Sequence, residues 1–140
     1  MIRIYYLLIS VIFCLAGCNV AQKFEDVSSA ATYNNYVGVE YVLNVEMHLS
    51  GVNAPPGYEE SIDYYVVNPA TPSWSGPELI TRETLPVGTV VRVQSVQRCT
   101  NCLSAQRLRA TITLTGRAPR DDRPVHISLE FLNGEFASRL

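Results

Sequence analysis

The stretch that decides the fold is residues 37–49, Val-Gly-Val-Glu-Tyr-Val-Leu-Asn-Val-Glu-Met-His-Leu. All its odd-numbered positions are apolar, and the positions between them are mostly polar. A period of two places the apolar side chains on one face of a β-strand, whereas helical spacing would scatter them around the axis. We therefore predict a long, half-buried strand here, with Gly38 as a point where it bends.

Shorter segments with the same pattern follow along the chain. Strands are expected over residues 62–68, 79–83, 89–98, 107–115 and 125–131. Proline-rich and glycine-rich breakers separate them, and the alternation within 89–98 changes phase near Gln94 and Ser95, which predicts a β-bulge. Five to six strands with frequent turns and no convincing helix predict an all-β domain. It is either a small antiparallel barrel or a compact β-sandwich.

One turn adds a resemblance to a known fold. The segment Leu85-Pro-Val-Gly-Thr-Val-Val-Arg-Val93, nine residues long, resembles the Leu-Pro-x-Gly-Thr start of a strand in bacterial SH3-like barrels. This resemblance favours an SH3-like barrel over the sandwich.

Residues 1–18 are typical of a targeting sequence rather than of an element of the folded domain. Arg3 precedes an apolar run of about a dozen residues, which is shorter than the roughly 20 that a membrane-spanning helix needs and fits a signal peptide. The run ends in Leu15-Ala16-Gly17-Cys18, which resembles the lipobox of bacterial lipoproteins. The resemblance implies that diacylglycerol is attached to the Cys18 thiol, that residues 1–17 are removed and that the new amino group is acylated. The alternatives are an ordinary signal peptide and a single anchor helix ending in cysteine.

The residues after the lipobox indicate where the protein is sent and how it is tethered. The residue that follows Cys18 is Asn19 and not an aspartate. In the enteric sorting pattern, this resembles the signal of a lipoprotein that is sent to the outer membrane, where the domain would face the periplasm. Residues 18–35 are small, polar and aperiodic, which predicts a flexible tether, with the β domain over 36–140. The seventeen residues from 19 to 35 would span about 20–25 Å root-mean-square. In the alternative, Phe24 and Val27 dock on the domain.

Two cysteines remain in the mature domain, Cys99 and Cys102. In the cell envelope we expect them to form a disulfide, whose small ring contributes about 2 kcal/mol. A redox-active pair would need a helix start, and the flanks here are typical of strand and loop. A zinc site would need two further ligands, and the chain has only two histidines to offer.

Motifs for common chemistries are missing from the sequence. There is no Gly-x-Ser-x-Gly elbow, no phosphate-binding glycine loop and no His-Glu-x-x-His. His48 and His126 fall on strand positions that are expected to face solvent. The acidic group Glu59, Glu60 and Asp63 follows a Pro-Pro-Gly loop, where a solvated cluster is expected rather than a catalytic pair. We expect no enzymatic activity and no cofactor apart from the acyl chains on Cys18.

The charge distribution suggests a binding surface. The net charge of −2 argues against nucleic acid as a partner. Residues 19–78 carry a net charge of −7 and residues 79–140 a net charge of +4. The basic residues of this second segment are all arginines. We predict an anion-binding patch on the strands and aromatic contacts on the proline-rich loops. Its candidate residues are Arg92, Arg107, Arg109, Tyr58 and Trp74. The alternatives are that the arginines are solvated or face the acidic half, and that the aromatics cover the core.

These features together predict a non-enzymatic envelope lipoprotein, held in the membrane by its lipid anchor. Its β domain would bind a protein or a cell-wall component. One alternative is an inhibitor or immunity-type lipoprotein that blocks a wall hydrolase or a delivered toxin. Another is a redox protein that uses Cys99 and Cys102.

Overall fold

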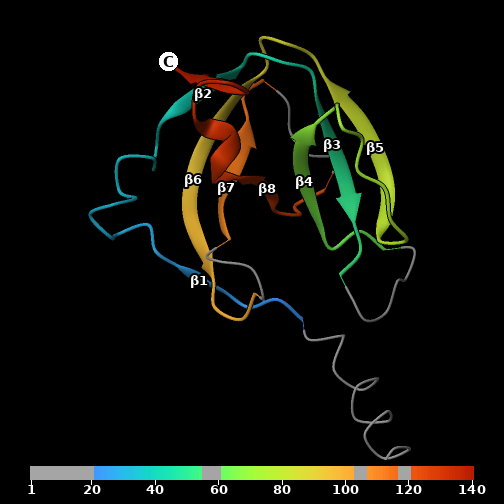
Figure 1. Ribbon diagram of the computed structural model, residues 1–140, viewed down its shortest axis with the longest axis horizontal. Helices are drawn as coiled ribbons and strands as arrows, with labels where there is room; N and C mark the ends of the chain where they lie inside the picture. Colours follow the sequence, from blue (N-terminus) through green and yellow to red (C-terminus); the bar gives the residue numbers. More distant parts are fainter. Residues whose placement is uncertain (1–20, 55–60, 103–106, 117–120) are drawn as a thin grey trace, which may run out of the picture.

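A computed structural model describes residues 21–54, 61–102, 107–116 and 121–140, and this part of the chain is almost entirely β-structure (Figure 1). Cys18 and Tyr58 lie outside the described residues. The strands are β1 (Phe24–Asp26), β2 (Glu40–Leu43), β3 (Met47–Val52), β4 (Tyr64–Pro69), β5 (Leu79–Leu85), β6 (Val90–Cys99), β7 (Leu108–Leu114), β8 (Val125–Ser128) and β9 (Ala137–Arg139), with a 3-10 turn η1 (Leu129–Leu132). The all-β prediction is confirmed. The described strands number nine rather than five to six, because short β1 and β9 lack a readable alternation and because the first strand is divided.

The strands form one mixed sheet that does not close into a barrel. Their order is β5-β3-β4-β8-β7-β6-β2-β9, with β1 paired to β6. β4 and β8 run parallel, and the other pairings described are antiparallel. Since β5 and β9 end this order, the SH3-like barrel is not formed within the described residues. The arrangement is compatible with the small β-sandwich that the sequence left as the other possibility.

The predicted long strand 37–49 is broken at Asn44. β2 pairs with β6 and β9, whereas β3 pairs with β4 and β5, so the chain passes from one half of the sheet to the other at this point. The Asn44 side chain donates to the Gly134 carbonyl (3.0 Å) and to Ser138 Oγ (2.7 Å), which holds the break. The alternation continues through it, so that Leu43 and Met47 are both fully buried in the same core.

The core lies between the two halves of the sheet, which curve toward each other in Figure 1. Its largest fully buried apolar side chains are Leu43, Met47, Val67, Leu85, Val91, Val93, Val96, Val125 and Ile127. The pairing of β6 with β7 shifts register between Val93 and Ser95, which confirms the predicted bulge. Because of this shift Val96 rejoins the core and Gln97 lies on the opposite face, level with Arg109.

The segment before β2 belongs to the domain. β1 pairs with the end of β6, Phe24 opposite Cys99, and the Val27 N–H donates to the Val96 carbonyl (2.9 Å). Tyr33 and Tyr36 pack against the core. The predicted flexible tether is therefore wrong from Lys23 to residue 35, because turns deliver these apolar side chains at irregular spacing that no periodicity reveals. Among the described residues, no helix is long and apolar enough to cross a membrane.

Candidate functional site

A row of side chains crosses the face of the sheet that lies opposite the core. Gln97 on β6 is level with Arg109 on β7, and Thr111 on β7 is level with His126 on β8. Tyr64 at the start of β4 extends the row, because its ring centroid lies 5.7 Å from that of His126. Side chains of neighbouring strands that share a level and a face interact with one another. The row therefore forms one polar and aromatic cluster.

Arg109 is the charged centre of this row. Its Nε donates to Gln97 Oε1 (2.8 Å), and its Cζ lies 3.5 Å from the centroid of the Phe24 ring. The side chain is half-buried, and burial lowers the pKa of its guanidinium from the ordinary value, although arginine stays charged at neutral pH. Within the described part of the chain, no carboxylate lies within 4.0 Å of it, and its two terminal amino groups have no hydrogen-bond partner.

His126 is buried beside this arginine, with 6% of its surface exposed. Its Nδ1 lies 3.3 Å from Thr111 Oγ1. Burial, and secondly the positive charge of Arg109, lowers the pKa of His126 to about 4, so the ring is neutral at pH 7. The prediction that His126 faces solvent is wrong. Alternation assigned it correctly to the face away from the core, but β8 lies between β4 and β7, and side chains of both neighbours cover the ring.

The two adjacent tyrosines of β4 point to opposite faces, as consecutive residues of a strand must. Tyr65 packs against the core, and its hydroxyl lies 3.4 Å from Asp121 Oδ2. Tyr64 stacks on His126 on the other face, and burial raises the pKa of its phenol above the ordinary value. Arg109 therefore has two uncharged neighbours, Tyr64 and His126, at neutral pH.

The remaining predicted binding residues do not gather around Arg109. Arg92 lies on β6 opposite Thr113, four residues along β7 from Arg109, which is about 13 Å at ~3.3 Å per residue. It lines an open hollow of about 380 Å³ together with Gly38, Val39, Glu40, Arg139 and Leu140. Arg107 is exposed just before β7. Trp74 is half-buried, and its carbonyl accepts a hydrogen bond from Arg82 on β5, at the far end of the strand order.

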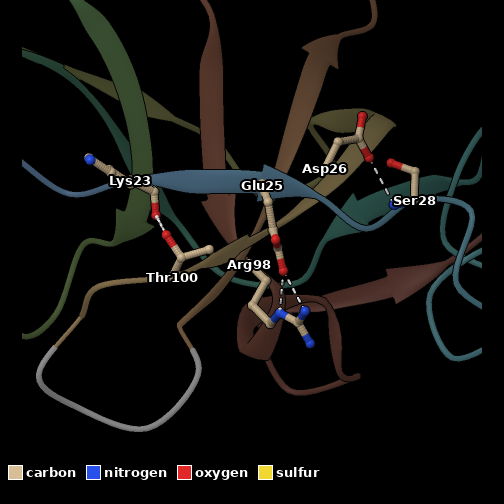
Figure 2. Close-up of polar contacts among 6 residues, drawn as sticks. All are labelled: Lys23, Glu25, Asp26, Ser28, Arg98 and Thr100. Atoms are coloured by element: carbon tan, nitrogen blue, oxygen red, sulfur yellow. Dashed lines mark hydrogen bonds and ion pairs between the residues drawn. The ribbon is translucent and has the colours of Figure 1, made fainter.

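A second group of contacts fastens β1 to the end of β6 (Figure 2). The Arg98 guanidinium forms an ion pair with Glu25, its Nε donating to Glu25 Oε1 (2.9 Å). Asp26 Oδ1 accepts from the Ser28 N–H (2.8 Å), and this bonding lowers the pKa of the Asp26 carboxyl. The Lys23 ammonium points away from these contacts in Figure 2. The pairing of β1 with β6 is thus reinforced by an ion pair across the two strands, and a local hydrogen bond holds the turn that follows β1.

The cysteines contribute directly to this attachment. Cys99 and Cys102 form a disulfide with a Cα–Cα distance of 5.7 Å, which confirms the predicted pairing. Inside the ring, the Thr100 N–H donates to the Lys23 carbonyl (2.9 Å), and Asn101 Oδ1 accepts from the Lys23 N–H (2.7 Å). The Asn101 side-chain amide also donates to the Ala21 carbonyl (2.9 Å). The disulfide therefore closes a small loop that holds residues 21–23.

Among the described residues, no group of three or more His, Cys, Asp or Glu side chains could hold a metal ion. Cys99 is the last residue of strand β6, so it does not have the helix-start position in which a helix dipole depresses the pKa of a thiol.

Several members of the site were not predicted. Gln97, Thr111 and His126 share the face of Arg109. The alternation of residues 107–115, together with the bulge near Ser95, is the signal that could have placed Gln97 and Thr111 beside Arg109. Phe24 had no such signal, because it lies in a segment without periodicity and reaches Arg109 only through the pairing of β1 with β6.

Comparison with known proteins found no matching family model, no matching curated protein and no matching solved structure. The function is therefore argued from the residues and geometry of this chain.

Proposed function

We propose that this protein is a lipid-anchored envelope protein whose β domain binds an anionic group of a protein or cell-wall component and catalyses no reaction. Cys18 would carry the lipid after removal of residues 1–17, and the domain would face the periplasm from the outer membrane. The lipobox residues Leu15-Ala16-Gly17-Cys18 support the anchor. The row around Arg109 supports the binding activity.

The observation that carries the binding proposal is the state of Arg109. A half-buried guanidinium is costly when water solvates it only in part, and no carboxylate among the described residues compensates the charge of Arg109. Gln97 and Phe24 nevertheless hold it in one orientation. Its terminal N–H groups remain available for bidentate bonding to a carboxylate or a phosphate. A fixed but unpaired arginine of this kind supports the recognition of an anion.

The disulfide supports a structural role rather than a catalytic one. Thr100 and Asn101, the two residues inside its ring, are both engaged with the backbone of residues 21–23. A redox function would leave these contacts unexplained. We therefore place Cys99 and Cys102 in the attachment of β1.

The experiment is capture of the partner from envelopes solubilised in an uncharged detergent, with the lipidated full chain as bait. Arg109→Gln is expected to reduce capture at least tenfold, because a hydrogen bond to a charged group contributes about 1.5–3 kcal/mol. Arg123→Gln is the matched control, since Arg123 is an exposed arginine five residues before Ser128, the β8 residue that lies opposite Arg109. Equal capture by the two variants, both folded, would contradict a binding role for Arg109.

A further inference from the structure

The chain length between Cys18 and β1 limits how far the Arg109 site can lie from a membrane. Phe24 follows Cys18 by six residues, which span at most about 22 Å when fully extended. The Arg109 guanidinium lies 3.5 Å from the Phe24 ring centroid. If Cys18 carries lipid, as proposed above, the site therefore lies close to the surface of the anchoring bilayer, within reach of its headgroups.

This limit applies because β1 is held on the domain. Residues 21–26 are bonded to β6 and to the loop that the disulfide closes, and Glu25 adds the ion pair with Arg98 (Figure 2). A free tether over the seventeen residues from 19 to 35 would instead let the domain move as far as about 60 Å from Cys18 when fully extended. Figure 1 shows β1 and the start of β7 at the same end of the domain, and β1 is the described strand that follows Cys18 most closely in the sequence.

Charge at this end of the sheet favours an anionic surface. Lys23 and Arg107 are exposed, and neither has a carboxylate within 4.0 Å among the described residues. Glu25 is already neutralised by Arg98. Two carboxylates offset part of the positive charge: Glu130, which follows β8 and accepts from Ser128 Oγ (3.1 Å), and Asp26 on β1, which accepts from the Ser28 N–H (2.8 Å). Lys23, Arg107 and Arg109 outweigh these two carboxylates.

We propose that Arg109, with Lys23 and Arg107 at the same end of the sheet, binds the phosphate of an anionic lipid headgroup in the bilayer that anchors Cys18. This inference rests on the proposed lipid anchor and goes beyond the proposed function, because the ligand is a lipid phosphate and not a group of the captured partner. A guanidinium matches phosphate oxygens bidentately, and the Phe24 ring beside it offers an apolar surface to the glycerol region of the lipid. The domain would then lie against the membrane on its β1 end instead of standing away from it.

The test uses the lipidated full chain, labelled with ¹⁵N, in nanodiscs of phosphatidylcholine with about 30% phosphatidylglycerol and a trace of lipid with a gadolinium headgroup. We expect strong paramagnetic relaxation of the Phe24 and Arg109 amides and little at Arg123, which lies at the opposite end of β8. In Arg109→Gln, the ratio of docked to undocked domain, read at the Phe24 amide, should fall about fivefold, because one cation near an anionic surface contributes about 1 kcal/mol. Arg123→Gln should leave that ratio unchanged.

A second variant protects the test from a folding defect. Lys23→Gln combined with Arg107→Gln changes only exposed side chains and should lower the same ratio by a factor of ten or more. Two results would overturn the headgroup proposal. One is paramagnetic relaxation that is uniform along the chain. The other is relaxation at the Phe24 amide that stays unchanged both in Arg109→Gln and in the Lys23→Gln, Arg107→Gln double variant. If partner capture still depended on Arg109, the proposed function would survive that result. Failure of the chain to enter nanodiscs would overturn the lipid anchor and this inference together.

Discussion

Buried His126 should make the domain lose stability as the pH falls from 6.5 to 4. Its pKa in the folded protein is about 4, against 6.5 in an unfolded chain, because burial and Arg109 oppose its positive charge. Between these two values the unfolded state binds a proton that the folded state does not. The free energy of unfolding therefore rises with pH across this window and falls as acid is added. A pKa difference of about 2.5 corresponds to about 3 kcal/mol in total, of which about 2 kcal/mol is lost between pH 7 and pH 4.5.

The assay is urea denaturation of the full chain in uncharged detergent at a series of pH values, followed by the fluorescence of Trp74, which is the single tryptophan. His126→Gln should be less stable at pH 7, because it removes packing against Tyr64 and the contact with Thr111, but its stability should fall much less between pH 7 and pH 4.5. His48→Gln removes the other histidine and should keep the wild-type slope. If His126→Gln retains the full loss of about 2 kcal/mol, the slope comes from other groups and the reasoning about His126 is refuted.

Four further outcomes are expected. Cys18→Ser should abolish labelling by a fatty-acid probe and leave the chain unprocessed; labelling that persists would remove the lipid from Cys18. In protein taken from the envelope without reductant, Cys99 and Cys102 should resist thiol alkylation, and two freely alkylated thiols would contradict the disulfide. Replacing both cysteines by serine should speed trypsin cleavage after Lys23 roughly tenfold or more, since closing the ring contributes about 2 kcal/mol to holding β1, whereas cleavage after the exposed Arg82 on β5 should not change. Partner capture should weaken as salt rises from 0.1 M to 1 M, because the Debye length falls from about 10 Å to about 3 Å; capture that is independent of salt but lost in Trp74→Ala would move the binding site to the loop beside β5.

Much of the local structure could be read from the residues one segment at a time. The alternation of residues 37–49 predicted strands with the right buried positions, such as Leu43 and Met47, and the phase change near Ser95 predicted the bulge in β6. The pairing of Cys99 with Cys102 was also accessible, because only two residues separate them and the ring closes locally. These features depend on neighbours within a few positions, and a period of two is visible over such a distance.

The predictions that were wrong concern features that depend on contacts between residues far apart in the chain. Asn44 ends β2 through bonds to Gly134 and Ser138, so the sequence around residue 44 alone reads as a continuous strand. The parallel pairing of β4 with β8, which places Tyr64 beside His126, joins segments about 60 residues apart in the chain, since Tyr65 lies opposite Val125.

Side-chain direction and turn chemistry are local properties, so the residues alone predict which face of each strand is apolar, where the chain turns and how the cysteines pair. The covered cluster on the opposite face, with His126 uncharged and Arg109 held between Gln97 and Phe24, emerges only from the pairing of distant strands. A strand's own pattern predicts that a side chain points away from the core, whereas the solvation of that side chain depends on which strands lie on either side of it.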